Sequence, residues 1–241
     1  MSMPAFWLPG EWQNEIALTG DEARHFNVLR LRPEARVLLL NGAGKSGLFV
    51  CRAVRKRAIT LELEREWQTP APTSRPIIAL ALSKAVRRGF FLEKSAELGA
   101  WAVWLWQAER SQGGLTEKLA ETCAAQIRAG AKQCHNPWFP KLRSFKNAED
   151  LARASEDCEW RLLPWEQRAG EPVINREQLG RPGATVYIIG PEGGLAQTEV
   201  DCFRAFGFVP VSLGSRVLRC ETAATLCLGL HNWASQPEAQ A

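Results

Sequence analysis

Two loops of the chain combine glycines and charged residues directly after apolar, strand-like segments. The first is "IIGPEGGLAQTEV" at 188–200, in which Gly190, Glu192, Gly193 and Gly194 follow the uncharged run "ATVYII". Glycines at such a place let a ligand approach the backbone N–H and C=O groups closely. Glu192 would repel a phosphate. The loop therefore favours a ligand with positive charge and no phosphate, and S-adenosylmethionine, with its cationic sulfonium and its adenosine, has that chemistry.

The second loop follows the apolar segment "FVPVSLG" at 208–214 and reads "SRVLRCE". It contains Arg216, Arg219 and Glu221, and it leads into the last helix-like segment of the chain. In open α/β sheets, ligands bind beyond the carboxyl ends of the strands. Two loops that leave two strands on the same edge can therefore converge on one pocket.

A glycine motif nearer the N-terminus matches the consensus of a nucleotide-binding loop, but its flanking segments do not fit such a loop. "GAGKSG" at 42–47 matches G-x-G-x-x-G, but the segments on both sides are strand-like and no helix opens from it. Leu39 stands where a P-loop needs its first glycine. We predict a hairpin turn with Gly42 at positive φ, and a nicotinamide enzyme built on this motif is a disfavoured alternative. The adjacent Cys134 and His135 have no second pair to complete a metal site, so no metal is expected.

The elements around these loops divide the chain into two regions. Residues 1–68 are mostly β, with strands expected over 35–42, 46–54 and 58–67. One helix is expected at "DEARHFNVLRL", with Asp21 as its cap and His25, Val28 and Leu29 on one face. A proline-rich linker at 69–76 follows. From residue 77 to 241 strands alternate with helices, which predicts an α/β fold with a mainly parallel sheet covered on both faces.

Charge and composition narrow the class of protein. The net charge is +4, and residues 75–143 carry most of the excess, with 11 Lys and Arg against 5 Asp and Glu. Such a segment is a weak sign of phosphate contact, and on charge alone a solvated helical face is the favoured interpretation. No run of eighteen apolar residues indicates a membrane helix, and the N-terminus lacks the pattern of a secretory signal. Seven scattered cysteines without C-x-x-C suit reduced thiols, so we expect a cytoplasmic protein.

The two loop motifs together strongly resemble a known family. "IIGPEGGL" followed by "SLGSRVLRCETAA" is similar to the RsmE family of SPOUT-class methyltransferases, which methylate N3 of a uridine in 16S ribosomal RNA. The resemblance extends to "HFNVLRLR" at 25–32, "LSKAVRRGFFLEKSAELG" at 82–99, "AERS" at 108–111 and "GFVPVSLG" at 207–214. Three departures stand out: Ser215 for a common proline, Cys220 for a usual threonine, and Lys132-Gln133-Cys134 for an acidic–glutamine–serine stretch.

The resemblance implies a PUA-like RNA-binding barrel over 1–68 and a trefoil-knotted, parallel-sheet methyltransferase domain over 77–241. It implies S-adenosylmethionine as the donor, 16S ribosomal RNA within the small subunit as the partner, and a homodimer with the pocket near its interface. No metal or membrane is implied. The donor would be held by Ile189, Gly190, Glu192, Gly193 and Gly194 in one loop and by Leu213, Gly214, Arg216, Val217 and Leu218 in the other.

Methylation of N3 requires loss of the N3 proton, which leaves an anion spread over O2 and O4 of the uracil. An arginine on an imide oxygen would stabilise that anion. Arg219 is the first candidate and Arg216 the second, while Glu221 would serve as a base or orient an arginine. The alternative for Arg219 is an ion pair with Glu221 that only holds the loop.

Several basic residues are candidates for RNA contact. They are His25, for which a satisfied barrel histidine is the favoured alternative, Arg30 and Arg32 in the same expected helix, and Lys84, Arg87 and Arg88 in the basic segment. Trp101, Trp104 and Trp106 could stack on bases, pack in the core or be buried in a dimer. Two rival functions stay open: a SPOUT methyltransferase acting on another RNA, and a non-catalytic ribosome-assembly factor that binds RNA.

Overall fold

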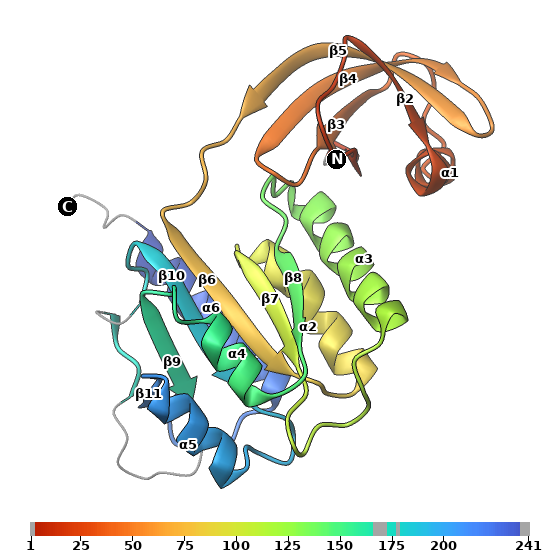
Figure 1. The fold of residues 1–241 in the computed structure, drawn as a ribbon. Coiled ribbons are helices and arrows are strands. Elements are labelled where there is room, and N and C mark those ends of the chain that lie inside the picture. The colour runs from red at the N-terminus through yellow and green to blue at the C-terminus, as the bar shows by residue number, and fades with distance from the viewer. Residues whose placement is uncertain (1–2, 166–172, 177–178, 237–241) are drawn as a thin grey trace. The chain divides into compact units, whose positions relative to one another are not determined.

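The computed structural model describes residues 3–165, 173–176 and 179–236. Its contacts divide the chain into two units (Figure 1). The first unit comprises Met1–Ala71 and a segment from the middle of the sequence, Ala131–Phe139, and the second comprises Pro72–Gly130 and Pro140–Ala241. The sequence did not predict that Ala131–Phe139 joins the N-terminal unit.

The first unit contains a five-stranded sheet with the order β1-β3-β4-β5-β2, in which β1 pairs with β3 in parallel and the other pairs are antiparallel. The three predicted strands are confirmed, and two short strands were not predicted. The elements are β1 (Ala5–Trp7), β2 (Glu15–Thr19), β3 (Arg36–Leu40), β4 (Lys45–Val54) and β5 (Ala58–Gln68). Along β5, Ile59 and Leu61 are buried while Glu62 and Glu64 are exposed, so the two-residue alternation in sequence determines which face packs on the core.

The helix of this unit is α1 (Gly20–Val28), and its details differ from the expectation. Its cap is Thr19 rather than Asp21, and its buried residues are Ala23 and Phe26. The expectation that Val28 lies on the packed face is wrong, because its side chain is 72% exposed. The observed buried face is rotated about the helix axis by a fraction of a turn from the expected one. The apolar pattern of a nine-residue helix is too short to fix its buried face more closely.

The chain after α1 leaves the helix earlier than expected. Leu29 is the C-cap and is 42% exposed, and Arg30 has a positive φ of 53°. Arg30 and Arg32 are therefore exposed loop residues and not part of the helix. His25 is exposed on α1, near the ring of Phe6 at 5.5 Å.

The "GAGKSG" segment forms the turn between β3 and β4 and the first three residues of β4, which confirms the predicted hairpin. Gly42 has a φ of 82° and Gly44 a φ of 93°. The Ala131–Phe139 segment packs on this turn, because the backbone N–H of Gly44 donates to Pro137 at 2.8 Å and that of Phe139 donates to Gly42 at 3.1 Å. A Cβ atom on Gly44 would collide with the indole of Trp138, so this glycine serves packing.

The second unit contains a six-stranded sheet whose neighbouring strands are all parallel, which confirms the predicted sheet type. Its order is β11-β9-β10-β6-β7-β8. The strands are β6 (Ser74–Ala81), β7 (Ala102–Trp106), β8 (Lys141–Phe145), β9 (Trp160–Pro164), β10 (Gly183–Ile189) and β11 (Val209–Val211). Because β6 begins at Ser74, the last three residues of the expected linker are strand.

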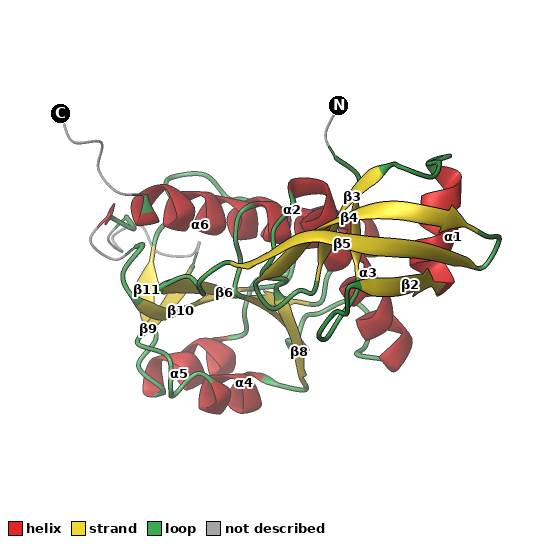
Figure 2. Ribbon diagram, turned by 90° about the horizontal axis from the view of Figure 1, so that it is seen from above, coloured by secondary structure: helices red, strands yellow, loops and turns green. Residues whose placement is uncertain are grey.

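Helices cover both faces of this sheet, as predicted (Figure 2). They are α2 (Ala85–Glu97), α3 (Glu117–Cys134), α4 (Ala148–Ala154), α5 (Gln197–Ala205) and α6 (Cys220–Ser235). One core lies between the sheet and α4 and α5, and the other lies between the sheet and α2, α3 and α6. The first core includes Trp104 and Trp106, which confirms core packing for these two. Trp101 is half-buried, with Lys141 4.6 Å from its ring centroid.

A buried histidine ties α6 to the sheet. His231 is 1% exposed, and its ring nitrogens bond to the hydroxyl of Tyr187 at 2.8 Å and to that of Ser74 at 2.7 Å. Burial disfavours the charged imidazolium and lowers the pKa of His231 to about 4. The three polar groups satisfy one another inside an otherwise apolar core, and they join α6, β10 and β6.

Candidate active site

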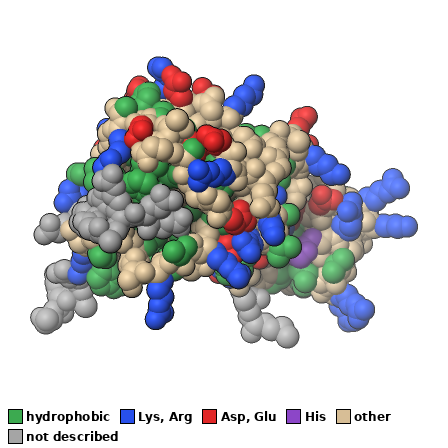
Figure 3. Space-filling model, turned by 90° about the horizontal axis from the view of Figure 1, so that it is seen from below, with side chains coloured by type: hydrophobic (Ala, Val, Ile, Leu, Met, Phe, Trp, Pro, Cys, Tyr) green, Lys and Arg blue, Asp and Glu red, His purple; other side chains and the backbone are tan. Residues whose placement is uncertain are grey.

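The two loops highlighted by the sequence leave neighbouring regions of one sheet edge. β10 ends at Ile189 and β11 at Val211, and both strands run parallel to β9 between them. The loops after these two strands line one cavity of about 270 Å³. Figure 3 looks onto this end of the strands, where acidic and basic side chains lie side by side next to hydrophobic surface. The lining residues are Arg87, Pro164, Trp165, Ile189, Gly190, Pro191, Glu192, Gly194, Leu195, Ser212, Leu213, Gly214, Arg216, Val217, Leu218, Arg219, Cys220 and Ala223.

All but one of the residues expected to hold the donor line this cavity. The exception is Gly193, which packs on the loop after β7. Its carbonyl accepts a hydrogen bond from Nη1 of Arg110 at 3.1 Å, and a Cβ atom here would lie 3.2 Å from Cβ of Arg110. Gly193 therefore permits the contact between two loops, while Gly190 and Gly194 border the cavity directly.

Arg87 connects the two loops through their carboxylates. Its Nη1 lies 3.3 Å from Oε1 of Glu192, and its Nε lies 3.7 Å from Oε1 of Glu221. The backbone N–H of Lys84 also points to Glu192, at 3.5 Å. Two carboxylates facing one guanidinium leave a net negative charge, which suits a cationic ligand. Arg87 was expected to contact the RNA backbone, whereas the structure places it in the wall of the cavity.

The two candidate catalytic arginines are exposed on the cavity wall. Arg219 is the N-cap of α6, and Arg216 lies three residues before it in the loop. The alternative in which Arg219 forms an ion pair with Glu221 is not present: within the described residues, the ion pair of Glu221 is with Arg87. Both guanidinium groups are therefore available to a ligand.

Cys220 is buried at the first position of α6, where a threonine was expected from the family resemblance. Burial, more than its other contacts, raises the pKa of the Cys220 thiol to about 11. The protonated thiol donates to Oε2 of Glu221 at 3.3 Å. A weak donor therefore stands where the hydroxyl would be, and Glu221 keeps a partner on that side.

The sequence analysis missed Glu199, which supports the loops beside the cavity without lining it. Glu199 is 8% exposed, and its carboxylate accepts from the backbone N–H of Glu109 at 2.8 Å and of Ala196 at 2.9 Å. One group thus joins the loop after β7 to the end of the loop after β10. The available signal was its position at N3 of a helix, where a carboxylate reaches back to the N-cap backbone.

The other expected RNA contacts lie in different surroundings. Lys84 is exposed at the N-cap of α2. Arg88 is only 9% exposed, and its Nη1 donates to the carbonyl of Ser83 at 2.7 Å. Arg88 is therefore a core residue of the second unit, not the exposed RNA contact that the basic segment suggested.

The side chains of Cys134 and His135 bind backbone oxygens. The Sγ of Cys134 donates to Ala131 at 3.6 Å, and Nε2 of His135 bonds to the carbonyl of Met3 at 2.9 Å. Within residues 3–165, 173–176 and 179–236, no group of three or more His, Cys, Asp and Glu side chains could hold a metal ion. In the same part of the chain no helix has both the length and the apolar character needed to cross a bilayer.

Comparison with known proteins identifies the family. Residues 69–232, more than half of the chain, match the family described as an RNA methyltransferase domain. The chain belongs to this RNA methyltransferase family. Residues 18–64 match the RNA methyltransferase PUA domain. The family resemblance that the two loop motifs carried is therefore confirmed.

Relatives of this RNA methyltransferase share a name. The Ribosomal RNA small subunit methyltransferase E of Mycobacterium bovis is 29% identical over 219 residues, which cover 87% of this chain and 83% of the relative. The protein of the same name from Bacillus subtilis is 26% identical, with 88% of each chain covered.

Two solved structures are similar over nearly the full chain. A methyltransferase of Legionella pneumophila, solved with bound SAM, is 26% identical with a TM-score of 0.89 over 97% of this chain and 98% of that one. The ribosomal RNA small subunit methyltransferase E of Neisseria gonorrhoeae, bound to S-adenosyl methionine, is 27% identical with a TM-score of 0.84 over 94% and 95%.

Proposed function

We propose that the chain is an S-adenosylmethionine-dependent methyltransferase that methylates N3 of a uridine in 16S ribosomal RNA of the small subunit. The observation that carries the proposal is the cavity lined by both glycine-bearing loops at the carboxyl ends of β10 and β11. The names of the relatives and the donor bound in two similar structures support the same function. The choice of N3 rests on the family resemblance.

The residues of the cavity fit the donor. Gly190, Gly194 and Gly214 border the cavity without a side chain, so a ligand can approach the backbone closely, and apolar side chains such as Leu213 and Leu218 border the same space. The volume is near the lower end for small-molecule pockets, and the carboxylate of Glu192 favours a cation. S-adenosylmethionine supplies an electrophilic methyl group on a cationic sulfonium. Gly193 contributes by allowing the loop to pack on Arg110.

The side chains beside the cavity then act on the uracil. Arg219, and second Arg216, would donate hydrogen bonds to an imide oxygen, which stabilises the anion formed when N3 loses its proton. Glu221 would accept that proton or hold Arg87 in place; its ion pair with Arg87 favours the second role. Most of the rate gain would come from holding the reacting atoms in line.

The RNA would reach this cavity with its target base out of the stack. After Arg87, which binds two carboxylates of the cavity, and the buried Arg88 are removed from the set, the proposed phosphate contacts are the exposed Lys84 beside the cavity and the exposed His25, Arg30 and Arg32 of the PUA-type unit. The proposed place of action is the cytoplasm. Barrel closure of the first unit and a trefoil knot in the second are further parts of this proposal, both from the family resemblance.

A homodimer is part of the same proposal. α2 exposes Val86 and Phe90, four residues apart on one helical face, at 87% and 53%. The neighbouring Arg87 and Lys84 contact Glu192, so a partner covering this face would lie near the donor cavity. Light scattering should give twice the chain mass, and Phe90→Asp should shift it toward the monomer. A wild-type monomer at micromolar concentration would refute the dimer.

The function is tested with small ribosomal subunits that lack the modification. The protein and a methyl-labelled donor are incubated with these subunits, and the labelled base is mapped; the proposal expects label at N3 of one uridine of 16S RNA. Calorimetry with S-adenosylmethionine and its demethylated product measures donor binding separately. A non-catalytic assembly factor would bind subunits without binding donor, and label in another RNA would change the substrate but not the chemistry.

A further inference from the structure

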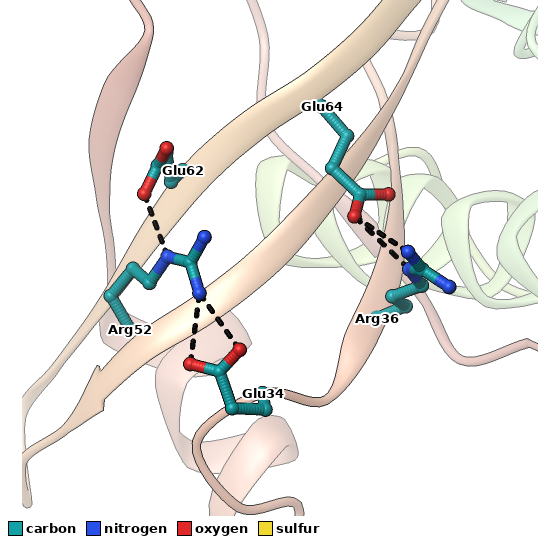
Figure 4. A network of polar contacts seen from close by, with 5 residues as sticks. All are labelled: Glu34, Arg36, Arg52, Glu62 and Glu64. Carbon is teal, nitrogen blue, oxygen red and sulfur yellow. Dashed lines mark hydrogen bonds and ion pairs between the residues drawn. The ribbon is translucent and has the colours of Figure 1, made fainter.

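One group of cations in the first unit is paired with carboxylates. On the outer face of β3, β4 and β5, Arg36 pairs with Glu64 at 2.9 Å, and Arg52 pairs with Glu34 and Glu62 at 2.8 and 2.6 Å (Figure 4). Farther along the same strands, Lys45 pairs with Glu11 at 2.7 Å and with Glu66 at 3.0 Å. The cations of this face are thus compensated by nearby carboxylates.

The second group lies in the turn between β4 and β5. Arg55, Lys56 and Arg57 occupy the turn, all three are exposed, and the N–H of Arg55 donates to the carbonyl of Ala58 at 3.0 Å to close it. Among the residues that the structure describes, no ion pair involves any of the three. Three consecutive cations are therefore presented to solvent on a closed turn.

Two further free cations lie at the same end of the sheet. The loop after α1 runs beside β4 as that strand approaches the turn, because Glu34 N–H donates to Cys51 at 2.7 Å and Cys51 N–H donates to Ala35 at 2.9 Å. This loop contains Arg30 and Arg32, which are exposed and, within the described chain, form no ion pair. They extend the positive surface of the turn.

The carboxylates of the neighbouring segments bind other cations. Asp21 pairs with Arg24 at 3.0 Å, Glu22 pairs with Lys132 at 2.7 Å, and Glu34 shares Arg52 with Glu62. Among the described residues, none of these carboxylates pairs with Arg30, Arg32 or the cations of the turn, which differ in this from the paired cations of the outer face. Uncompensated cations on a rigid element attract a polyanion and release its counterions on binding.

We propose that the β4–β5 turn, Arg55–Lys56–Arg57, is the main phosphate contact of the first unit and binds the RNA backbone, with Arg30 and Arg32 extending the contact. The inference rests on the proposed function, which makes RNA the substrate. The turn reads charge and not sequence, since phosphate contacts position a protein on RNA without reading its bases. Its task is to increase affinity for the substrate and leave the donor cavity unchanged.

The test compares two variants of the full chain with equal changes in charge. The turn variant carries Arg55→Gln, Lys56→Gln and Arg57→Gln. The control carries Arg36→Gln, Lys45→Gln and Arg52→Gln, which removes three cations of the same unit that are already paired. Dissociation constants for a fragment of small-subunit ribosomal RNA are measured from about 50 to 300 mM salt, with donor binding by calorimetry and thermal melting as checks on the fold.

The turn variant should bind RNA about 100-fold more weakly at 0.1 M salt, and its log–log salt slope should fall by about 2 to 3. The control should change affinity by less than about threefold, and both variants should bind donor like the wild type. Equal affinities and slopes for the two variants would overturn the inference, including the case where both lose affinity through net charge alone. If the wild type methylates ribosomal RNA and the turn variant does so with an unchanged KM, only the turn is refuted. A wild type that binds donor but no RNA would reject the proposed substrate as well.

Discussion

Two glycine-rich loops of this protein look alike in sequence and do opposite things. "GAGKSG" at 42–47 and "GPEGG" at 190–194 each follow a buried apolar strand. The first connects β3 directly to its antiparallel neighbour β4. Its glycines pack against the side chain of Trp138 and bond to the backbone of residues 137–139. The second leaves a parallel strand and must cross to a helix, which leaves open space at the sheet edge.

The two loops differ because different elements come after them. An antiparallel return brings the next strand back beside the first, so the turn has no room for a ligand. A parallel sheet collects all its crossover loops at the ends of its strands, and two of them enclose a cavity. The secondary structure on either side of a glycine motif therefore indicates its role better than the match of its residues to a consensus sequence.

The largest expected effect on function comes from Arg219, in the loop after β11 that lines the cavity. Arg219→Ala should lower kcat by about 100- to 1,000-fold if Arg219 is the proposed hydrogen-bond donor to the uracil anion. The affinity for S-adenosylmethionine and the melting temperature should stay near wild-type values, as Arg219 forms no ion pair within the described chain. Single-turnover methylation of subunits measures the loss, and Arg216→Ala should lose less. Full turnover with an earlier melt would make Arg219 a structural residue.

A matched pair of glycine substitutions sharpens the comparison. Gly44→Ala should lower the free energy of unfolding by about 3 kcal/mol, because its φ of 93° is strained for alanine and the new methyl group meets Trp138. The donor affinity of the folded protein should not change. Gly190→Ala should do the reverse, with a small loss of stability and a donor affinity about tenfold weaker, since its Cβ would lie 3.0 Å from Leu195 in the cavity wall.

Urea melts and calorimetry on the two variants measure both quantities. If Gly44→Ala weakened donor binding as much as Gly190→Ala, the two loops would not differ in function as proposed.

Much of the second unit could be predicted from its sequence because its signals are local. An uncharged run such as β10, in which the last five of seven residues are buried and a glycine follows, indicates an interior parallel strand, and helices between such runs require a covered sheet. β8 was missed because it is an edge strand: Lys141 and Arg143 are exposed and only Phe145 is buried.

The rest depends on contacts between residues distant in sequence. No local pattern shows that Ala131–Phe139 packs on a turn near the N-terminus, or that Glu199 bonds to the backbone of Glu109. Arg87 and Arg88 are adjacent and chemically identical, yet one borders the cavity and the other enters the core. Composition indicated the charge of that segment correctly, but which arginine turns inward depends on how α2 packs against its neighbours.

Acid should unfold the second unit before the first. The folded pKa of His231, about 4, lies below its ordinary value of 6.5, so the unfolded chain binds more protons between these values. The stabilising contribution is complete above pH 6.5 and is lost as the pH falls toward 4, by about 3 kcal/mol in all. Urea melts at stepped pH values measure the effect, with fluorescence and far-UV circular dichroism as the probes.

Two histidine variants serve as controls for this acid effect. His25→Gln removes an exposed imidazole and should keep the pH dependence of the wild type. His231→Asn should lower stability at neutral pH and flatten the dependence between pH 6.5 and 4. An unchanged slope in the second variant would show that another group causes the acid loss.

The smallest expected effect concerns Glu199, which fixes the end of the loop between β10 and α5. Glu199 accepts two backbone N–H groups from two loops, while a glutamine can accept only one and must turn its NH₂ toward the other. Glu199→Gln should therefore leave one buried N–H unpaired, loosen the loop before α5 and weaken donor binding about fivefold, or about 1 kcal/mol. Asp201→Asn makes the same change of charge on the exposed face of α5 and should bind donor normally. Calorimetry well below the melting temperature separates this from general instability: equal donor affinities for the two variants would mean that Glu199 stabilises the fold without positioning the loop.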